Sequence, residues 1–180
     1  MPSIHSSSVN GDFDTSQLID QAQTMQRWLA AGNSVGDAMN ISPEQREALY
    51  QLGHGFYSQA RFEDAFSVFS LLVIYEHMNE RYLMALAGAA QMLGKYKDAL
   101  QHYSTAALLM VNDPRPIFFS GECLIALGNF ELAAESLSLV TEIADDSSAQ
   151  QALKSRANIL LASIAGKDNT AASADTSTTR

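Results

Sequence analysis

The chain has 180 residues, 47% of them hydrophobic, and its 20 acidic and 11 basic side chains give a formal net charge of −9. It contains no apolar run long enough to span a bilayer, its first residues lack the pattern of a secretory signal, and its single cysteine cannot form an internal disulfide. We therefore expect a soluble, cytoplasmic, single-domain protein that neither inserts into membranes nor binds nucleic acid, since its charge opposes a phosphate backbone.

The first predicted element is an amphipathic helix that follows a short polar tail. Residues 1–13 carry too little apolar surface to offset the entropy lost on ordering, so we predict a disordered tail there. Asp14 is then a suitable helix cap, and Leu18, Met25 and Leu29 fall on one helical face.

The clearest helix start in the sequence lies at residues 42–45. Ser42 can cap the helix, Pro43 suits the first helical position because its missing N–H costs nothing there, and Gln45 completes a capping box. Asp113 followed by Pro114 is a second start signal, with the aspartate predicted as the cap.

Three stretches of the chain repeat one another at a fixed spacing. Ala65, Ala99 and Ala133 are 99 − 65 = 34 and 133 − 99 = 34 residues apart, which is the period of tetratricopeptide repeats, each a hairpin of two helices. The sequence therefore predicts an all-α tetratricopeptide solenoid of three helix hairpins. The predicted repeats are residues 46–79, 80–113 and 114–147.

Each predicted hairpin combines a close helix contact with a tight turn. Gly53 and Gly121 occupy the eighth position of their repeats, where a small residue lets the two backbones approach, and Leu52 is expected to fill the seam beside them. Gly94 and Gly128 supply the backbone freedom that the turns need.

A last helix is predicted after the third repeat, at about residues 149–165. Leu153 and Ile164 lie on one face of it, which suits a helix that covers the exposed end of the stack. The tetratricopeptide domain then spans residues 14–165, and residues 166–180, which lack large apolar side chains, are predicted to be a second disordered tail.

The first helix of each hairpin is expected to line a concave groove with its second, fifth, ninth and twelfth positions. Aromatic rings and methionines with a few polar groups suit an extended peptide. For any single tyrosine, such as Tyr50, Tyr57 or Tyr103, a place in the core with its hydroxyl at the edge is the alternative interpretation. The inward positions are Glu47, Tyr50, His54, Tyr57, Arg81, Met84, Gly88, Gln91, Arg115, Phe118, Glu122 and Ile125.

The residues that usually carry catalysis or bind metals follow no recognisable pattern. His5, His54, His77 and His102 fall at no metal-ligand spacing. Cys123 is expected to be a small buried hydrophobic residue. The sequence therefore predicts neither an enzyme nor a bound metal or other cofactor.

Over about residues 15–165, the chain resembles the class II chaperones of bacterial type III secretion systems, which attend hydrophobic translocator proteins. The resemblance rests on the N-terminal helix ending Trp28-Leu29-Ala30-Ala31-Gly32, on Phe62-Glu63-Asp64-Ala65 and on Gly94-Lys95-Tyr96. The total length and the three repeats make it more specific than a repeat pattern alone.

This resemblance implies a cytoplasmic chaperone that keeps a translocator soluble and apart from its co-translocator before export. In that family, a nearly extended segment resembling Pro-x-Leu-x-x-Pro lies in the concave groove and loses little entropy on docking. His54 stands where relatives can carry an aromatic residue, a departure that would weaken one pocket or alter the choice of partner. The candidate client-binding residues are Tyr50, His54, Tyr57, Phe62, Phe69, Met84 and Tyr103.

The resemblance also implies self-association through the N-terminal helix. The candidate contacts of a homodimer are Leu18, Met25, Trp28 and Leu29. Packing of the same side chains against the first repeat is the alternative.

A general tetratricopeptide adaptor that assembles soluble protein partners is the main alternative function. A polar, charged groove would be expected for such an adaptor. Among the predicted inward positions, however, the only Lys or Arg residues are Arg81 and Arg115. Some members of the resembled family also partner a transcriptional activator of the AraC type, a co-activator role that these residues do not test.

Overall fold

The computed structural model describes residues 15–31, 34–145 and 147–175, without the side chains of 167–175 and of a few residues before 30. The predicted tail at 1–13 and the predicted cap Asp14 lie outside these residues. The sequence predicts one domain, whereas the contacts divide the chain into two compact units, residues 1–34 and 35–180. Among the described residues, no helix is both long and apolar enough to cross a membrane.

The described residues of the first unit form one helix, α1 (Thr15–Ala30), at the place where the apolar spacing predicts it. Arg27 stabilises its last turn, because its guanidinium donates to the backbone carbonyl of Gln23 at 3.2 Å. The predicted dimer contacts Leu18, Met25, Trp28 and Leu29 belong to this helix, but their side chains lie outside the described part of the chain.

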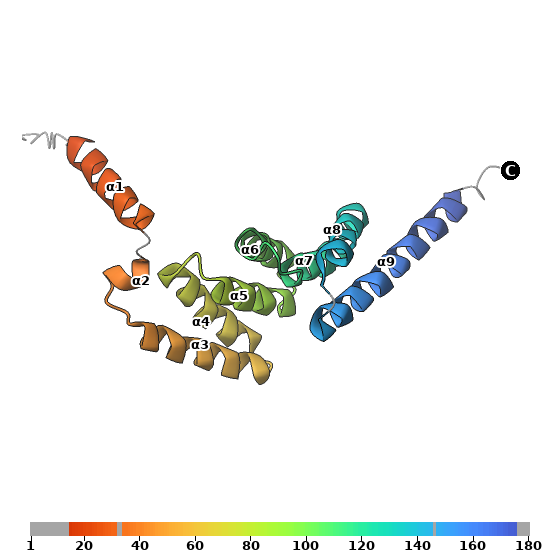
Figure 1. Ribbon diagram of the computed structural model, residues 1–180, viewed down its shortest axis with the longest axis horizontal. Coiled ribbons are helices and arrows are strands. Elements are labelled where there is room, and N and C mark those ends of the chain that lie inside the picture. Colours follow the sequence, from red (N-terminus) through yellow and green to blue (C-terminus); the bar gives the residue numbers. More distant parts are fainter. Residues whose placement is uncertain (1–14, 32–33, 146, 176–180) are drawn as a thin grey trace, which may run out of the picture. The chain divides into compact units, whose positions relative to one another are not determined.

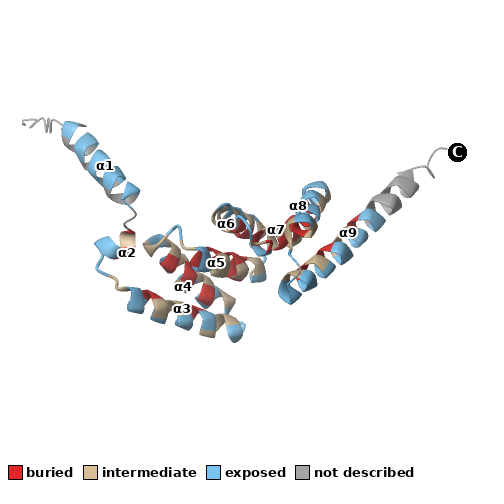
Figure 2. Cartoon of the chain, in the orientation of Figure 1, coloured by how far each residue is buried: buried red, intermediate tan, exposed pale blue. Residues whose placement is uncertain are grey.

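The second unit is a succession of helix hairpins, in which each helix from α3 onward packs against the next (Figure 1). The short helix α2 (Val35–Ala38) precedes three hairpins. These are α3 (Pro43–Ser58) with α4 (Phe62–Tyr75), α5 (Glu80–Met92) with α6 (Tyr96–Leu109), and α7 (Arg115–Ala126) with α8 (Phe130–Ile143). The predicted all-α solenoid of three hairpins is confirmed. Its buried residues lie on the faces that the helices turn toward one another (Figure 2).

The final helix, α9 (Ser148–Asp175), is longer than the sequence predicts. It continues past residue 165 through residues that were expected to form a disordered tail. The physical reason is local, because this stretch contains no proline and Gly166 is its one glycine, so little in the backbone stops the helix. Residues 176–180 lie outside the described residues.

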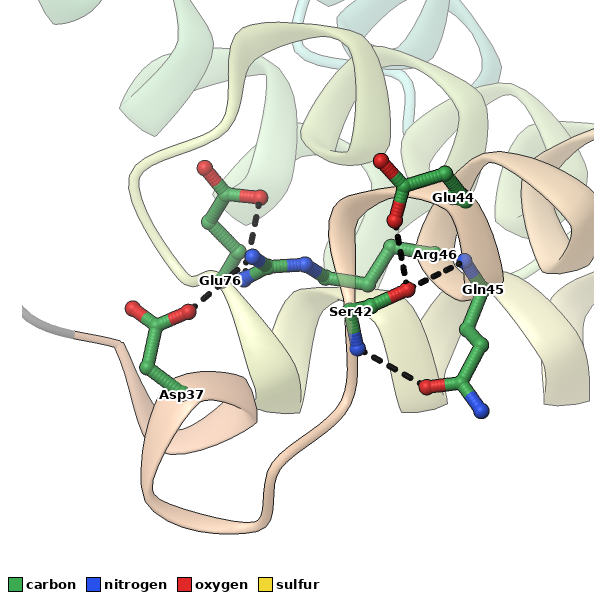
Figure 3. A network of polar contacts seen from close by, with 6 residues as sticks. All are labelled: Asp37, Ser42, Glu44, Gln45, Arg46 and Glu76. Carbon is green, nitrogen blue, oxygen red and sulfur yellow. Dashed lines mark hydrogen bonds and ion pairs between the residues drawn. The ribbon is translucent and has the colours of Figure 1, made fainter.

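The predicted capping box at the start of α3 is confirmed (Figure 3). The backbone N–H of Gln45 donates to Ser42 Oγ at 3.3 Å, and the backbone N–H of Ser42 donates to Gln45 Oε1 at 2.8 Å. Pro43 is the first helical residue.

The prediction for the start of α7 is wrong by one residue. Pro114, rather than Asp113, holds the cap position. The carboxylate of Asp113 instead accepts the backbone N–H of Arg115 at 2.9 Å and pairs with the guanidinium of the same residue. The Asp113 carboxylate thus satisfies a free amide of the first helical turn from one residue before the cap position. It takes the place of the side-chain cap that proline cannot supply.

The two helices of each hairpin meet where the sequence places small residues. A Cβ added to Gly53 would lie 2.5 Å from the Phe69 ring, and one added to Gly121 would lie 2.9 Å from Leu137. Leu52, which was expected to fill the seam, is instead 48% exposed. It lies on the side of α3 where no preceding hairpin packs within the second unit.

The turns between the paired helices share one left-handed residue. Gly94 has a φ of +72° and Gly128 a φ of +76°, as the sequence predicts, and Ala60 holds the same place in the first turn with a φ of +59°. An alanine is strained there because its Cβ crowds the backbone.

Arg46 joins α2 to the first hairpin (Figure 3). Its side chain is 9% exposed, and its guanidinium lies 3.0 Å from Asp37 on α2 and 3.7 Å from Glu76 at the end of α4. A buried charge is tolerated when opposite charges and hydrogen bonds compensate it. Gly36 makes the close fit possible, because an added Cβ would lie 3.1 Å from Arg46 and 3.2 Å from Tyr75.

Enlarging the small residue at the centre of a hairpin tests the register of the repeats. Ala99 is fully buried, so Ala99→Leu forces extra methylenes into the contact and should reduce the free energy of unfolding by roughly 1–3 kcal/mol. Thermal unfolding measures the effect, with Ala126→Leu at an exposed helix end as the control. An unchanged midpoint for Ala99→Leu would contradict the register.

Opposite exchanges in two equivalent turns should have opposite effects. Gly94→Ala should lower the free energy of unfolding by about 1–2 kcal/mol, because an alanine Cβ there has open space but an unfavourable φ. Ala60→Gly should raise it by about 0.5 kcal/mol, because relief of the strain exceeds the entropy that glycine gains in the unfolded chain. Urea denaturation compares both variants with the wild type. Changes of the same sign would show that these φ values do not control the turns.

Candidate functional site

A groove of about 510 Å³ runs along the first helices of the three hairpins. Residues of α3, α5 and α7 form most of its lining, and Phe69 from α4 and Tyr103 from α6 complete its floor. The periodicity of the sequence predicts this surface.

Six of the seven candidate client-binding residues line this groove: Tyr50, His54, Tyr57, Phe69, Met84 and Tyr103. The seventh, Phe62, is not among its lining residues. Phe62 is the first residue of α4, and its ring packs edge-on against Tyr57 with 5.3 Å between the ring centroids. It therefore contacts a groove residue without lining the groove itself.

The third hairpin departs most from the expected pattern. Phe118 was predicted to face the groove, but it is fully buried, and the neighbouring Phe119 lines the groove instead. Phe119 stacks on Tyr103 with 5.5 Å between the ring centroids. With two adjacent phenylalanines, the sequence carries no signal that says which of them enters the groove. The predicted inward positions Glu47 and Ile125 are also absent from the lining.

Aromatic rings cluster at the α3 end of the groove. The centroid of the Tyr50 ring lies 5.9 Å from those of His54, Phe69 and Tyr82. The guanidinium of Arg81 lies 4.2 Å from the centroid of the same ring. Such a cluster offers an apolar surface with a polar edge, which suits the capture of apolar side chains.

Arg81 is held in place by a second contact, an ion pair of 3.1 Å with Glu47. Hydrogen bonds from Gln51 and, second, from Arg81 lower the pKa of the Glu47 carboxyl, and the hydrogen bond to Glu47 raises the pKa of the Arg81 guanidinium. Both groups are solvent-exposed, so the pair orients the cation over Tyr50 more than it stabilises the fold.

Gly88 keeps the middle of the groove open. A Cβ at this position would lie 3.7 Å from the hydroxyl of Tyr103 and 3.8 Å from that of Tyr57. The equivalent positions in the neighbouring repeats, 34 residues away, hold His54 and Glu122, whose side chains project into the groove. The absence of a side chain at Gly88 therefore leaves room for a ligand atom between the two tyrosines.

Tyr103 presents a protonated hydroxyl at the floor. It is 2% exposed, and desolvation raises the pKa of its phenol, so the group stays neutral at physiological pH. The hydroxyl donates to Gln91 Oε1 at 2.8 Å, and Gln91 Nε2 donates to Glu122 Oε2 at 3.0 Å. The polar groups at the floor are thus paired with one another, which leaves the rings and methionines as the main contact surface.

Cys123 is fully buried beside this site, as the sequence predicts. Burial raises the pKa of its thiol to about 11, so the thiolate, the nucleophilic form, is scarce at neutral pH. The residues lining the groove are suited to holding an extended chain by its apolar side chains.

Comparison with known proteins gives relatives for this fold and groove. A tetratricopeptide-repeat family model matches residues 90–157. The chaperone protein SicA of Salmonella typhimurium is 32% identical over 120 residues, which cover 67% of this chain and 73% of SicA.

Two similar solved structures contain a bound partner segment. PcrH in complex with the chaperone binding region of PopD is 33% identical, with a TM-score of 0.67, covering 71% of this chain and 96% of PcrH. The type III secretion translocator chaperone SycD of Yersinia enterocolitica, in complex with a peptide of the translocator YopD, is 30% identical, with a TM-score of 0.67, covering 71% of this chain and 98% of SycD. SycD has also been solved as an alternative dimer. These likenesses place the chain in the family of type III secretion translocator chaperones.

Proposed function

We propose that this protein is a cytoplasmic chaperone that binds a hydrophobic translocator protein and keeps it soluble and unassembled until its export. An extended client segment resembling Pro-x-Leu-x-x-Pro occupies the groove described above. The observation that carries this proposal is the apolar groove along α3, α5 and α7. The chain is similar to PcrH, solved with the chaperone binding region of PopD, and to SycD, solved with a peptide of the translocator YopD.

The chemistry of the groove fits such a segment. Proline-rich chains are already nearly extended, so they lose little conformational entropy on docking. If three apolar side chains of the client each contribute about 2 kcal/mol, the cost of ordering the segment still leaves roughly micromolar affinity. The flexible methionines of the lining, Met84, Met92 and Met110, can adapt to different clients.

Binding of an apolar client, without catalysis, fits the site better than the assembly of soluble partners by an adaptor. A groove that assembles soluble partners through charged termini needs cations that are available to them. Arg81 and Arg115, the basic residues among those lining this groove, are engaged with Glu47 and Asp113. The buried thiol of Cys123 also supports a role in binding rather than in catalysis.

A side chain placed in the open middle of the groove tests this proposal. Gly88→Leu should weaken binding of a synthetic peptide containing Pro-x-Leu-x-x-Pro by roughly tenfold to a hundredfold, because the leucine takes the space of a client side chain. Stability should not fall, since leucine favours a helix more than glycine does. Fluorescence anisotropy measures the affinity, and thermal unfolding measures the stability.

Gly55→Leu is the matched control. Gly55 lies on α3, an added Cβ there meets nothing within 4 Å, and the residue does not line the groove. Its peptide affinity should equal that of the wild type. If Gly88→Leu folds and binds the peptide as tightly as the wild type, the client does not occupy this groove.

We also propose that the protein forms a homodimer through the apolar face of α1, and the alternative dimer of SycD supports self-association in this family. Trp28→Ala combined with Leu29→Ala should halve the mass measured by light scattering, because it removes large apolar contacts. Ala31→Ser, a small change after the end of α1, is the control. A monomer mass for the wild type at every working concentration would contradict dimerisation.

A further inference from the structure

Helix α9 occupies the place of the first helix of a fourth repeat. Arg156 lies 156 − 122 = 34 residues after Glu122, so it holds the same repeat position as Glu122, Gly88 and His54. The helix contacts both α8 and α7, as α5 contacts both α4 and α3 (Figure 1). Ala157 is fully buried, like Cys123 one period earlier. Stacking of α9 on the third hairpin therefore follows the geometry of the repeats.

The other face of α9 lacks the features that would hold a second helix. Gln151 stands where earlier repeats carry leucine or isoleucine, Ser155 stands where they carry glycine or alanine, and both are exposed. The helix therefore stacks as a repeat does but leaves Gln151 and Ser155 open to solvent, and its ninth position holds Arg156.

From this position on α9, the side chain of Arg156 contacts two residues of α7. Its guanidinium donates to Glu122 Oε1 at 3.0 Å and lies 4.6 Å from the centroid of the buried Phe118 ring. The side chain of Glu122 is 25% exposed, so the cation compensates a carboxylate that is partly removed from water.

Glu122 is also part of the groove, and each of its oxygens holds one donor. Its Oε2 accepts the side-chain amide of Gln91 at 3.0 Å, while Gln91 Oε1 accepts the hydroxyl of Tyr103 at 2.8 Å. Four side chains from four helices thus form one hydrogen-bonded chain. Because both ends of the Gln91 amide are engaged, its orientation at the groove floor is fixed.

We propose that Arg156 is a positioning residue for client binding, so that α9 acts on the groove and does not only cover the end of the stack. Arg156 holds Glu122, Glu122 holds Gln91, and the floor is preorganised before the client arrives. This inference rests on the function proposed above. Without Arg156, the partly buried carboxylate turns toward water, Gln91 loses a partner, and binding must order the floor again.

Peptide affinity in charge-neutralised variants of the full chain tests this inference. Arg156→Gln should weaken binding of the labelled Pro-x-Leu-x-x-Pro peptide roughly threefold to tenfold. Adding Glu122→Gln should restore the affinity to within about twofold, because a neutral amide still accepts the hydrogen bond from Gln91 and needs no cation. Lys154→Gln, which removes a charge from the same helix, should leave the affinity unchanged.

Recovery in the double variant separates positioning from simple capping of the stack. If Arg156 only stabilised α9, Arg156→Gln would lower the thermal midpoint and Glu122→Gln would not repair binding. Nuclear magnetic resonance of the free protein gives a second readout. The side-chain amide resonances of Gln91 should shift in Arg156→Gln and return in the double variant.

Three results would overturn the inference. Any one of them is sufficient. The first is that Arg156→Gln binds the peptide as tightly as the wild type, the second is that the double variant does not recover the affinity, and the third is that the Gln91 amide resonances do not shift in Arg156→Gln. Failure of the wild type itself to bind the peptide would instead overturn the proposed function, and this inference with it.

Discussion

The close contact between the two helices of each hairpin is the constraint on which the groove depends. Gly53 and Gly121 leave room for Phe69 and Leu137 to pack directly against the facing backbone, and Tyr103 holds the equivalent position in the second hairpin. The rings of Phe69 and Tyr103 pack in this contact and also line the floor of the groove. The same side chains therefore stabilise the fold and form part of the candidate binding surface.

Polar groups in this groove are mostly engaged with one another. Arg81 is held by Glu47 over Tyr50, and Gln91 is held between Tyr103 and Glu122. Such pairing removes the penalty of leaving a polar group unsatisfied when a client excludes water. Apolar contacts can then supply most of the affinity, which suits a chaperone whose clients are hydrophobic.

Sequence-based predictions were accurate where a single helix or turn decides the outcome, and less accurate at contacts between helices. The capping box of Ser42 was predicted correctly because both partners lie within one turn of helix. Leu52 was misplaced because its burial requires a preceding hairpin that the second unit lacks. Phe118 was misplaced because it is buried in a core that α7 shares with α8 and α9, and contacts with the distant helix α9 leave no local signal in the sequence.

By itself, the sequence determined the helical class, the 34-residue period and most of the groove-lining positions, because caps, turns and periodicity are local properties. It also carried the resemblance to translocator chaperones. Only the tertiary structure decided that Phe119 lines the groove, that Phe62 does not, and that Arg156 reaches Glu122. These outcomes depend on the orientation of side chains between helices that are distant in the sequence, and no local pattern encodes that orientation.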